Sequence, residues 1–171
     1  VDGGASWQRQ YIANHWMRGI RFIDSQVGVM VGNDGAVMRT TDGGATWAVM
    51  PSEGGQGLER VVFTDALNGW TVGTSTLIRT TDGGLSWRRV AVPLLDTWSI
   101  SLRDVHFADA RHGWIVGDQG TLLATDDGGE TWSPQASGTR RALYSVFALD
   151  AYTAWAGGSS GTVLATATGG R

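Results

Sequence analysis

The stretch that decides the fold is Thr40-Thr41-Asp42-Gly43-Gly44-Ala45-Thr46-Trp47, because it recurs along the whole chain. It returns as Thr80-Thr81-Asp82-Gly83-Gly84-Leu85-Ser86-Trp87 and as Thr125-Asp126-Asp127-Gly128-Gly129-Glu130-Thr131-Trp132. A shortened copy, Asp2-Gly3-Gly4-Ala5-Ser6-Trp7, lies near the start, and a decayed copy, Thr166-Ala167-Thr168-Gly169-Gly170, lies near the end. We call this motif the box. Its copies are about 40 residues apart, which is the size of one four-stranded blade of a β-propeller.

Each repeat also contains short runs with strand character. Gly69-Trp70-Thr71-Val72-Gly73 recurs as Gly113-Trp114-Ile115-Val116-Gly117, and an apolar run that ends in an acid, Val61-Val62-Phe63-Thr64-Asp65, precedes it. Runs of β-branched and aromatic residues bounded by glycine and aspartate are typical of strands. For the second repeat the sequence predicts strands over residues 59–64, 69–73, 76–81 and 86–91.

The sequence therefore predicts an all-β fold, a β-propeller built of four-stranded antiparallel blades in one domain over residues 1–171. The repeats cover roughly residues 12–50, 58–91, 102–134 and 143–171, and residues 1–11 supply a last strand. Because both ends carry part of a box, we expect these four repeats to belong to a larger propeller. The alternative is a closed four-bladed ring, in which residues 6–11 pair with residues 161–166.

Composition excludes several classes of protein. The chain has 171 residues, no cysteine and a formal net charge of −3. The absence of cysteine excludes a disulfide scaffold and a cysteine-ligated metal site, and the mild acidity argues against a nucleic-acid partner. No apolar run approaches the ~18 residues of a membrane-spanning helix, and no signal peptide stands at the start of this segment.

The box has the chemistry of a tight turn. An aspartate carboxylate can accept backbone N–H bonds from the residues that follow it, and glycine adopts positive φ without steric cost. The tryptophan at the end of the box can then fold over the turn. We expect a structural role for the box residues Asp2, Asp42, Trp47, Asp82, Trp87, Asp127 and Trp132.

The alternative for the box is a calcium site, since Asp126-Asp127-Gly128-Gly129 has some likeness to a calcium loop. It lacks the alternating oxygen ligands and the terminal glutamate that such a loop needs. The sequence therefore predicts neither a metal site nor a cofactor.

The box resembles the Asp-box, or bacterial neuraminidase repeat. Together with the Gly-Trp-x-Val-Gly phrase, it is similar to the photosystem II stability/assembly factor family of β-propellers. The resemblance implies a non-catalytic scaffold that holds a protein partner, such as a membrane-protein assembly intermediate. It also implies an extracytoplasmic location, which would be the periplasm, the thylakoid lumen or the cell exterior.

Asp-boxes also occur in sialidases and other glycosidases, so the alternative is part of a glycoside hydrolase or of a carbohydrate-binding propeller. A glycosidase needs two carboxylates that face one cleft. Four aspartates are used in boxes, and four more recur at strand ends, where turn formation accounts for them: Asp24, Asp65, Asp109 and Asp150. His106 occupies the repeat position that Arg21, Val62 and Phe147 occupy in the other repeats, which favours packing over catalysis. We therefore expect no enzymatic activity.

The segments between blades vary while the blade cores do not, and scaffolds place binding residues in such segments. Tryptophan and arginine are enriched at interface hot spots. We predict that a protein partner contacts Trp16, Arg18, Trp98, Arg103, Arg140 and Arg141. For Trp16 and Trp98 the alternative is that they cap the apolar ends of blades.

Overall fold

The computed structural model describes residues 4–8, 15–92 and 99–170, which form β-strands joined by short turns. Four antiparallel sheets follow one another along the chain, and we call them blades 1 to 4. Blade 1 contains β1 (Met17–Phe22), β2 (Gly28–Gly32), β3 (Val37–Thr40) and β4 (Ala48–Val49). Blade 2 contains β5 (Leu58–Phe63), β6 (Gly69–Gly73), β7 (Thr76–Thr80) and β8 (Arg88–Arg89).

Blade 3 contains β9 (Leu102–Phe107), β10 (Gly113–Gly117), β11 (Leu122–Thr125) and β12 (Ser133–Pro134). Blade 4 contains β13 (Leu143–Ala148), β14 (Ala154–Gly158) and β15 (Val163–Thr166). Three 3-10 turns join second to third strands, namely η1 (Asn33–Gly35), η2 (Asp118–Gly120) and η3 (Ser159–Gly161). The predicted all-β class and the blade architecture are confirmed, and β5 to β8 lie on the four strands predicted for the second repeat.

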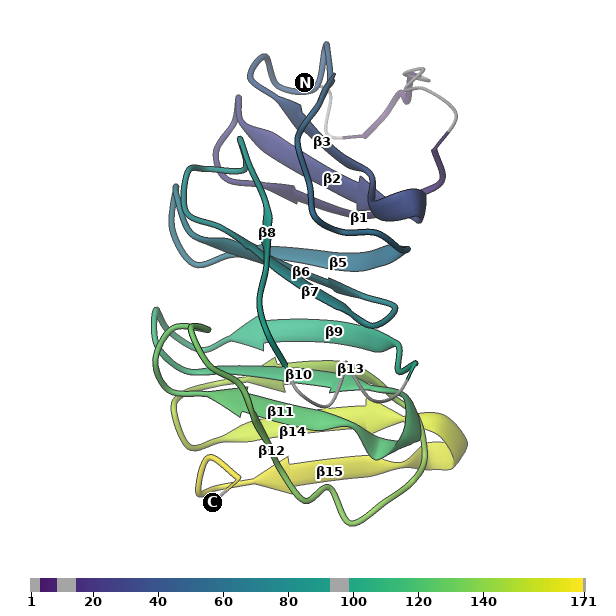
Figure 1. Ribbon diagram of the computed structural model, residues 1–171, viewed down its shortest axis with the longest axis vertical. Coiled ribbons are helices and arrows are strands. Elements are labelled where there is room, and N and C mark those ends of the chain that lie inside the picture. Colours follow the sequence, from purple (N-terminus) through teal and green to yellow (C-terminus); the bar gives the residue numbers. More distant parts are fainter. Residues whose placement is uncertain (1–3, 9–14, 93–98, 171) are drawn as a thin grey trace.

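The blades are stacked along the long axis of the molecule, with blade 1 at the top and blade 4 at the bottom of Figure 1. Blades 1 and 4 therefore lie far apart, and the blades form an open arc. Residues 4–8 form no strand, and β15 has β14 as its one strand neighbour within the described part of the chain. Residues 9–14, which include part of the predicted last strand, lie outside the described residues.

The turns divide the arc into two ends. The boxes meet the turns between first and second strands, as where Gly43 N–H donates to the Gln26 carbonyl over 2.9 Å. We call this the box end. The 3-10 turns meet the segments that lead into first strands, as where Asn33 N–H donates to the Trp16 carbonyl over 3.0 Å. We call this the loop end, and η1 and η3 mark it at the right of Figure 1.

Each complete box is a closed network of hydrogen bonds. In blade 1, the Thr40 hydroxyl donates to Asp42 Oδ1 over 2.7 Å and accepts the Gly44 N–H over 3.0 Å. Asp42 also accepts the Thr46 N–H over 2.9 Å and the Thr46 hydroxyl over 2.5 Å. The Trp47 indole N–H donates to the Gly44 carbonyl over 3.1 Å. The carboxylate oxygens are thus engaged by the turn that the aspartate begins.

The aspartates at the ends of first strands act as expected for turn residues. Asp24 Oδ1 accepts the N–H groups of Gln26 and Val27, each over 2.7 Å. The Val27 and Gln26 bonds lower the pKa of Asp24. The same pair of backbone bonds forms at Asp65, Asp109 and Asp150.

The tryptophans of blades 2 and 3 pack between neighbouring blades. Trp87 is buried with Val29, Val31 and Val37 of blade 1 as well as with Leu58 of its own blade. Trp132 lies in the equivalent cluster between blades 2 and 3. The box places these rings, because two successive glycines take positive φ there; in blade 2 the angles are 71° and 86°. The hydrophobic core is therefore a series of interfaces between blades.

We expect Trp87→Ala and Trp132→Ala each to lower the free energy of unfolding by about 3–5 kcal/mol, since each removes a large buried side chain. Denaturant titration followed by circular dichroism measures the change. Trp16→Ala, at an exposed tryptophan of the loop end, is the matched control and should change stability by less than about 1 kcal/mol. Equal losses in all three variants would contradict the assignment.

The box aspartates predict a pH dependence of stability. Hydrogen bonds from Thr46 lower the pKa of Asp42 to about 2. Burial alone raises the pKa of Asp82, but the bonds from Ser86 and Thr80 outweigh it and lower this pKa to about 2. A pKa below the unfolded value means that the box stabilises the fold above about pH 4 and loses that effect as the pH falls toward 2.

The unfolding free energy should therefore decrease between about pH 4 and pH 2, and Asp82→Asn should flatten that decrease. Urea titrations at pH 5, 4 and 3 measure it, with Asp34→Asn at an exposed loop-end position as control. A pH profile that is the same for both variants would contradict the role given to Asp82.

Candidate binding surface

The first strands of the blades, β1, β5, β9 and β13, lie side by side and form the inner surface of the arc. Each has a register shift near its start, so that one residue bulges out of the pairing with the second strand. A bulge re-aims its side chain and often lies beside functional sites. The bulged positions are Arg18, Glu59, Arg103 and Tyr144.

Arg18 joins blade 1 to blade 2. Its Nη1 lies 2.7 Å from Glu59 Oε1, and its Nε donates to Asn33 Oδ1 of η1 over 2.9 Å. Trp16 lies next to this pair and is 76% exposed. This exposure does not support the alternative in which Trp16 caps the apolar end of a blade. The Trp16 ring is available for contact.

A second basic group lies where blade 3 meets blade 4. Arg103 donates two hydrogen bonds to Asp118 of η2, each 2.9 Å long. These bonds raise the pKa of Arg103. The segment before β13 contacts the same turn, since a Cβ on Gly120 would collide with the Thr139 carbonyl. Arg140 and Arg141 follow Thr139 directly and are exposed.

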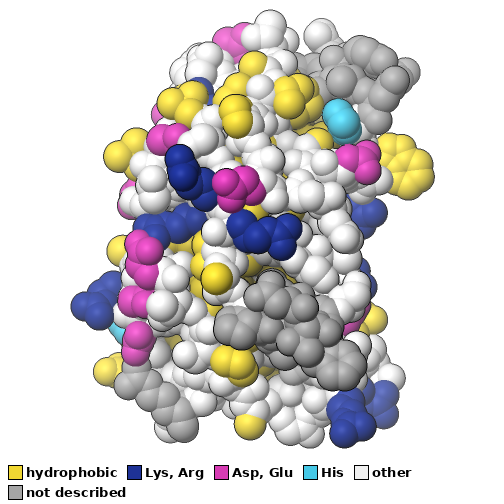
Figure 2. All heavy atoms as spheres, in the orientation of Figure 1, with side chains coloured by type: hydrophobic (Ala, Val, Ile, Leu, Met, Phe, Trp, Pro, Cys, Tyr) yellow, Lys and Arg dark blue, Asp and Glu magenta, His cyan; other side chains and the backbone are white. Residues whose placement is uncertain are grey.

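The sequence-predicted residues thus form two groups at the loop end. Trp16 and Arg18 lie at η1, and Arg103, Arg140 and Arg141 lie at η2. Trp98 lies outside the described residues. In Figure 2 acidic and basic side chains alternate along the left edge, which is the box end, and further basic side chains lie along the right edge.

A buried carboxylate that the sequence analysis missed links three blades on the inner surface. Asp104 of β9 is 4% exposed. Its Oδ1 accepts Arg60 Nε of β5, and its Oδ2 accepts the Ser145 hydroxyl and the Val146 N–H of β13, each over 3.0 Å. In the sequence, Asp104 is a charged residue between the apolar residues Leu102 and Val105. This pattern alone suggests a strand face that is exposed to solvent.

His106 is packed against a neighbouring ring, as its position in the repeat predicted. Its ring lies 4.8 Å from the ring of Phe147, and its Nδ1 accepts the Ala148 N–H over 3.2 Å. Burial lowers the pKa of His106 below the ordinary histidine value, which favours the neutral ring. A ring held in this way joins blade 3 to blade 4.

The described residues show no cluster suited to metal binding. No group of three histidine or acidic side chains gathers in residues 4–8, 15–92 and 99–170 in a way that could hold a metal ion. The strand-end and box aspartates already accept bonds from their own turns. No helix in the described part is long and apolar enough to cross a membrane.

Stacked antiparallel blades, three of which have four strands and end in the same glycine turn and tryptophan, define a β-propeller of the neuraminidase-repeat class. Within that class, the chain belongs to the family described as photosynthesis system II assembly factor YCF48, whose sequence model matches residues 1–96 and 91–171. The resemblance expected from the box and the Gly-Trp phrase is confirmed. No curated protein matches the chain by sequence.

Solved structures share the fold at low identity. YCF48 bound to D1 peptide is 20% identical with a TM-score of 0.57, and the match covers 98% of this chain and 69% of that one. An ancestral GH74 enzyme is 19% identical with a TM-score of 0.74, and the match covers 90% of this chain and 23% of the enzyme. The computationally designed Ika4 protein is 13% identical with a TM-score of 0.71, covering 89% of this chain and 91% of that one. At these identities the likeness shows the fold alone.

We expect Asp104→Ala to destabilise the protein by about 1–3 kcal/mol, because it leaves the buried Val146 N–H without an acceptor. Thermal or denaturant unfolding measures this loss. The matched control is Arg18→Ala, which removes an exposed arginine from the Arg18–Glu59 pair on the same surface and should cost less than about 1 kcal/mol. Equal losses in the two variants would contradict the role given to Asp104.

Proposed function

We propose that this protein is a non-catalytic scaffold that recognises a protein partner through the loop end of its blades. The observation that carries the proposal is the division between the two ends. At the box end, the carboxylates are engaged by their own turns. At the loop end, exposed Trp16 and the exposed pair Arg140 and Arg141 are available to a ligand.

The residue types suggest what this surface would bind. Arginine forms paired hydrogen bonds with carboxylates, and tryptophan supplies a large apolar contact. Arg18 and Arg103 are already held in place by acidic neighbours, so their aliphatic stems and remaining N–H groups are oriented in advance. We infer that the partner presents an extended segment with carboxylate groups and at least one apolar side chain.

Membership of the YCF48 family and the solved complex of YCF48 with D1 peptide support a peptide-like partner. On this basis we propose that the partner is a membrane protein during its assembly. An extracytoplasmic location is part of the same proposal, and it rests on family membership.

We further propose that the protein makes and breaks no bond in its partner. The GH74 enzymes share the blade architecture, but this chain spans 23% of the ancestral enzyme. Several described carboxylates of this chain are used in turns or in ion pairs, as at Asp42 in its box, at Asp104 between blades and at Asp118 within blade 3. These contacts favour a structural role for the acids over a pair that cooperates across a cleft.

The test is binding of immobilised protein to a synthetic D1 peptide, compared between two double variants. Arg140→Ala/Arg141→Ala should weaken binding roughly tenfold or more, because it removes two charged donors from the loop end. Arg88→Ala/Arg89→Ala removes the same charge from exposed β8 on the outer side of blade 2 and should leave binding unchanged. Trp16→Ala should weaken binding without lowering the melting temperature.

Equal weakening by the two double variants would show that binding depends on net charge and would contradict a site at the loop end. No binding of the peptide by the parent protein would restrict the proposal to partners of other sequence. Normal binding by Arg140→Ala/Arg141→Ala together with early melting of Trp16→Ala would identify these residues as blade caps.

A further inference from the structure

The inner surface of the arc has a hollow of about 270 Å³ where the first strands of blades 1, 2 and 3 end. Its polar lining consists of Arg21, Thr64, His106 and Asp109. Its apolar walls include Val62 and Phe63 of blade 2 and Phe107 of blade 3. This volume is close to the lower end of the ~300–1,000 Å³ of ligand pockets, so the hollow suits a small molecule.

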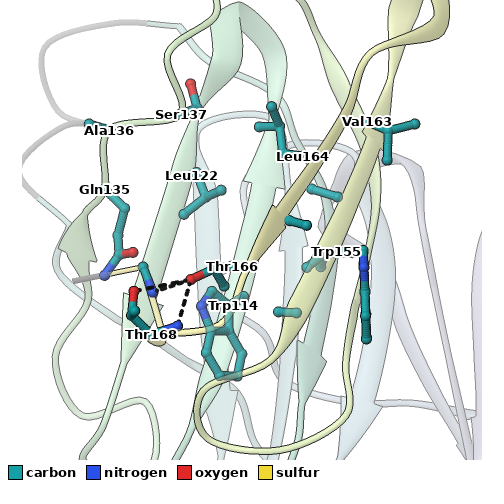
Figure 3. Close-up of a pocket in the computed structure, with 15 residues that line it drawn as sticks. Trp114, Leu122, Gln135, Ala136, Ser137, Trp155, Val163, Leu164, Thr166 and Thr168 are labelled. Atoms are coloured by element: carbon teal, nitrogen blue, oxygen red, sulfur yellow. Dashed lines mark hydrogen bonds between the residues drawn. The ribbon is translucent and has the colours of Figure 1, made fainter.

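A larger cavity of about 480 Å³ lies between blades 3 and 4, and Figure 3 shows Trp114, Leu122 and Leu164 around it. Among the residues that the structure describes, the lining of this larger cavity includes no charged side chain. The inner hollow differs because Arg21 gives it a permanent positive charge. Of these two spaces, the inner hollow is therefore the one that can select a ligand by charge.

Arg21 differs from the other arginines of the first strands in having no partner. In the described part of the chain these strands carry four arginines, and three of them form ion pairs: Arg18 with Glu59, Arg60 with Asp104 and Arg103 with Asp118. Arg21 is exposed and makes no hydrogen bond or ion pair in residues 4–8, 15–92 and 99–170. The N–H donors of its guanidinium are thus available, and a guanidinium binds carboxylates through paired hydrogen bonds.

His106 supplies a second donor, which its neighbour in blade 4 fixes. Its Nδ1 accepts the Ala148 N–H over 3.2 Å, so the proton of the neutral ring lies on Nε2. Nε2 has no hydrogen-bond partner in the described part of the chain, and it is not among the buried polar atoms there. The Nε2–H group is therefore free to donate to a ligand.

Arg21 and His106 act on the same region although they lie on different blades. Burial lowers the pKa of His106, Asp104 raises it, and the positive charge of Arg21 lowers it again. Arg21 is thus near enough for its charge to be felt at the ring. An anion in the hollow would be attracted by Arg21 and would accept the N–H of His106.

The carboxylates around the hollow limit the charge that a ligand can carry. Asp109 lines it and is held by its own turn, since it accepts the His112 N–H over 2.8 Å and lies 2.9 Å from His112 Nδ1. Asp24 and Asp65 line a neighbouring hollow, which shares Arg21. One guanidinium with three carboxylates nearby favours a ligand with a single negative charge over a dianion such as hydrogen phosphate.

We propose that the hollow binds a small organic monocarboxylate with an apolar body. The carboxylate accepts hydrogen bonds from Arg21 and from His106 Nε2, and the apolar body lies against Val62, Phe63 and Phe107. The walls come from three consecutive blades, and the hollow lies toward the box end of the inner surface. The proposal is therefore independent of the partner site at the loop end.

The test is titration of the 171-residue protein with benzoate, followed by the backbone amide signals in NMR spectra. The Ala148 amide should shift, because it donates to the ring of His106, and the dissociation constant should be on the order of 1 mM. Benzamide has a similar shape without the charge and should bind roughly tenfold more weakly or less. Inorganic phosphate should also bind more weakly than benzoate, because of the three nearby carboxylates.

Arg21→Gln should weaken benzoate binding by roughly tenfold or more and leave the melting temperature unchanged, since Arg21 is exposed. The matched control is Arg88→Gln, at an exposed arginine of the outer strand β8, which should bind benzoate as the parent does. His106→Phe keeps a ring beside Phe147 but removes the Nε2 donor, and it should weaken binding by about threefold or more.

Absence of a saturable shift in the parent protein would overturn the proposal, as would equal binding of benzoate and benzamide. Equal binding by Arg21→Gln and Arg88→Gln would also overturn it, and these comparisons hold even if His106→Phe fails to fold. Phosphate binding that is tighter than benzoate binding would contradict the assignment to a monocarboxylate.

Discussion

The insertion of a box tryptophan between two blades is the interaction on which the rest of this structure depends. A four-stranded sheet cannot bury both of its faces alone, and each blade is too small to contain a core of its own. Trp87 and Trp132 supply large apolar surfaces at the contacts between blades 1 and 2 and between blades 2 and 3. Because these contacts are the core, each blade owes its stability to its neighbours, as in other repeat proteins.

The requirement to hold these tryptophans explains the division of the molecule into two ends. A ring can be delivered to the same place in each blade only if the preceding turn is rigid. The threonine, aspartate and glycines of the box form that turn with bonds of 2.5–3.0 Å in blade 1. This uses the polar groups of the box end. The segments that lead into first strands at the loop end carry no box, and they display Trp16, Arg140 and Arg141.

The inner surface has a second set of contacts between blades. Arg18 reaches Glu59, and Arg60 and Ser145 meet at Asp104, so that polar bonds run from blade 1 to blade 4 along the first strands. His106 adds a ring contact to Phe147 in the same series. Apolar packing holds the body of the blades together, while these directional bonds fix how neighbouring first strands align.

The sequence alone determined the blades. The box marks the turns between third and outer strands, and the Gly-Trp phrase marks the second strands of blades 2 and 3, because both patterns depend on local backbone geometry and on a strand period of two. For that reason β5, β6 and β7 lie where the second repeat predicted them. The sequence also pointed to Arg140 and Arg141 in a segment between blades, and to Arg18 and Arg103 at equivalent positions where first strands start.

The tertiary structure alone decided which of these residues come together. Asp104 looks like an exposed strand residue in sequence, and it is buried because β5 and β13 approach it from both sides. Arg103 and the segment at Arg140 meet because both contact η2. Contacts between blades join residues about 40 positions apart, and local patterns carry no information about which faces pack at that distance.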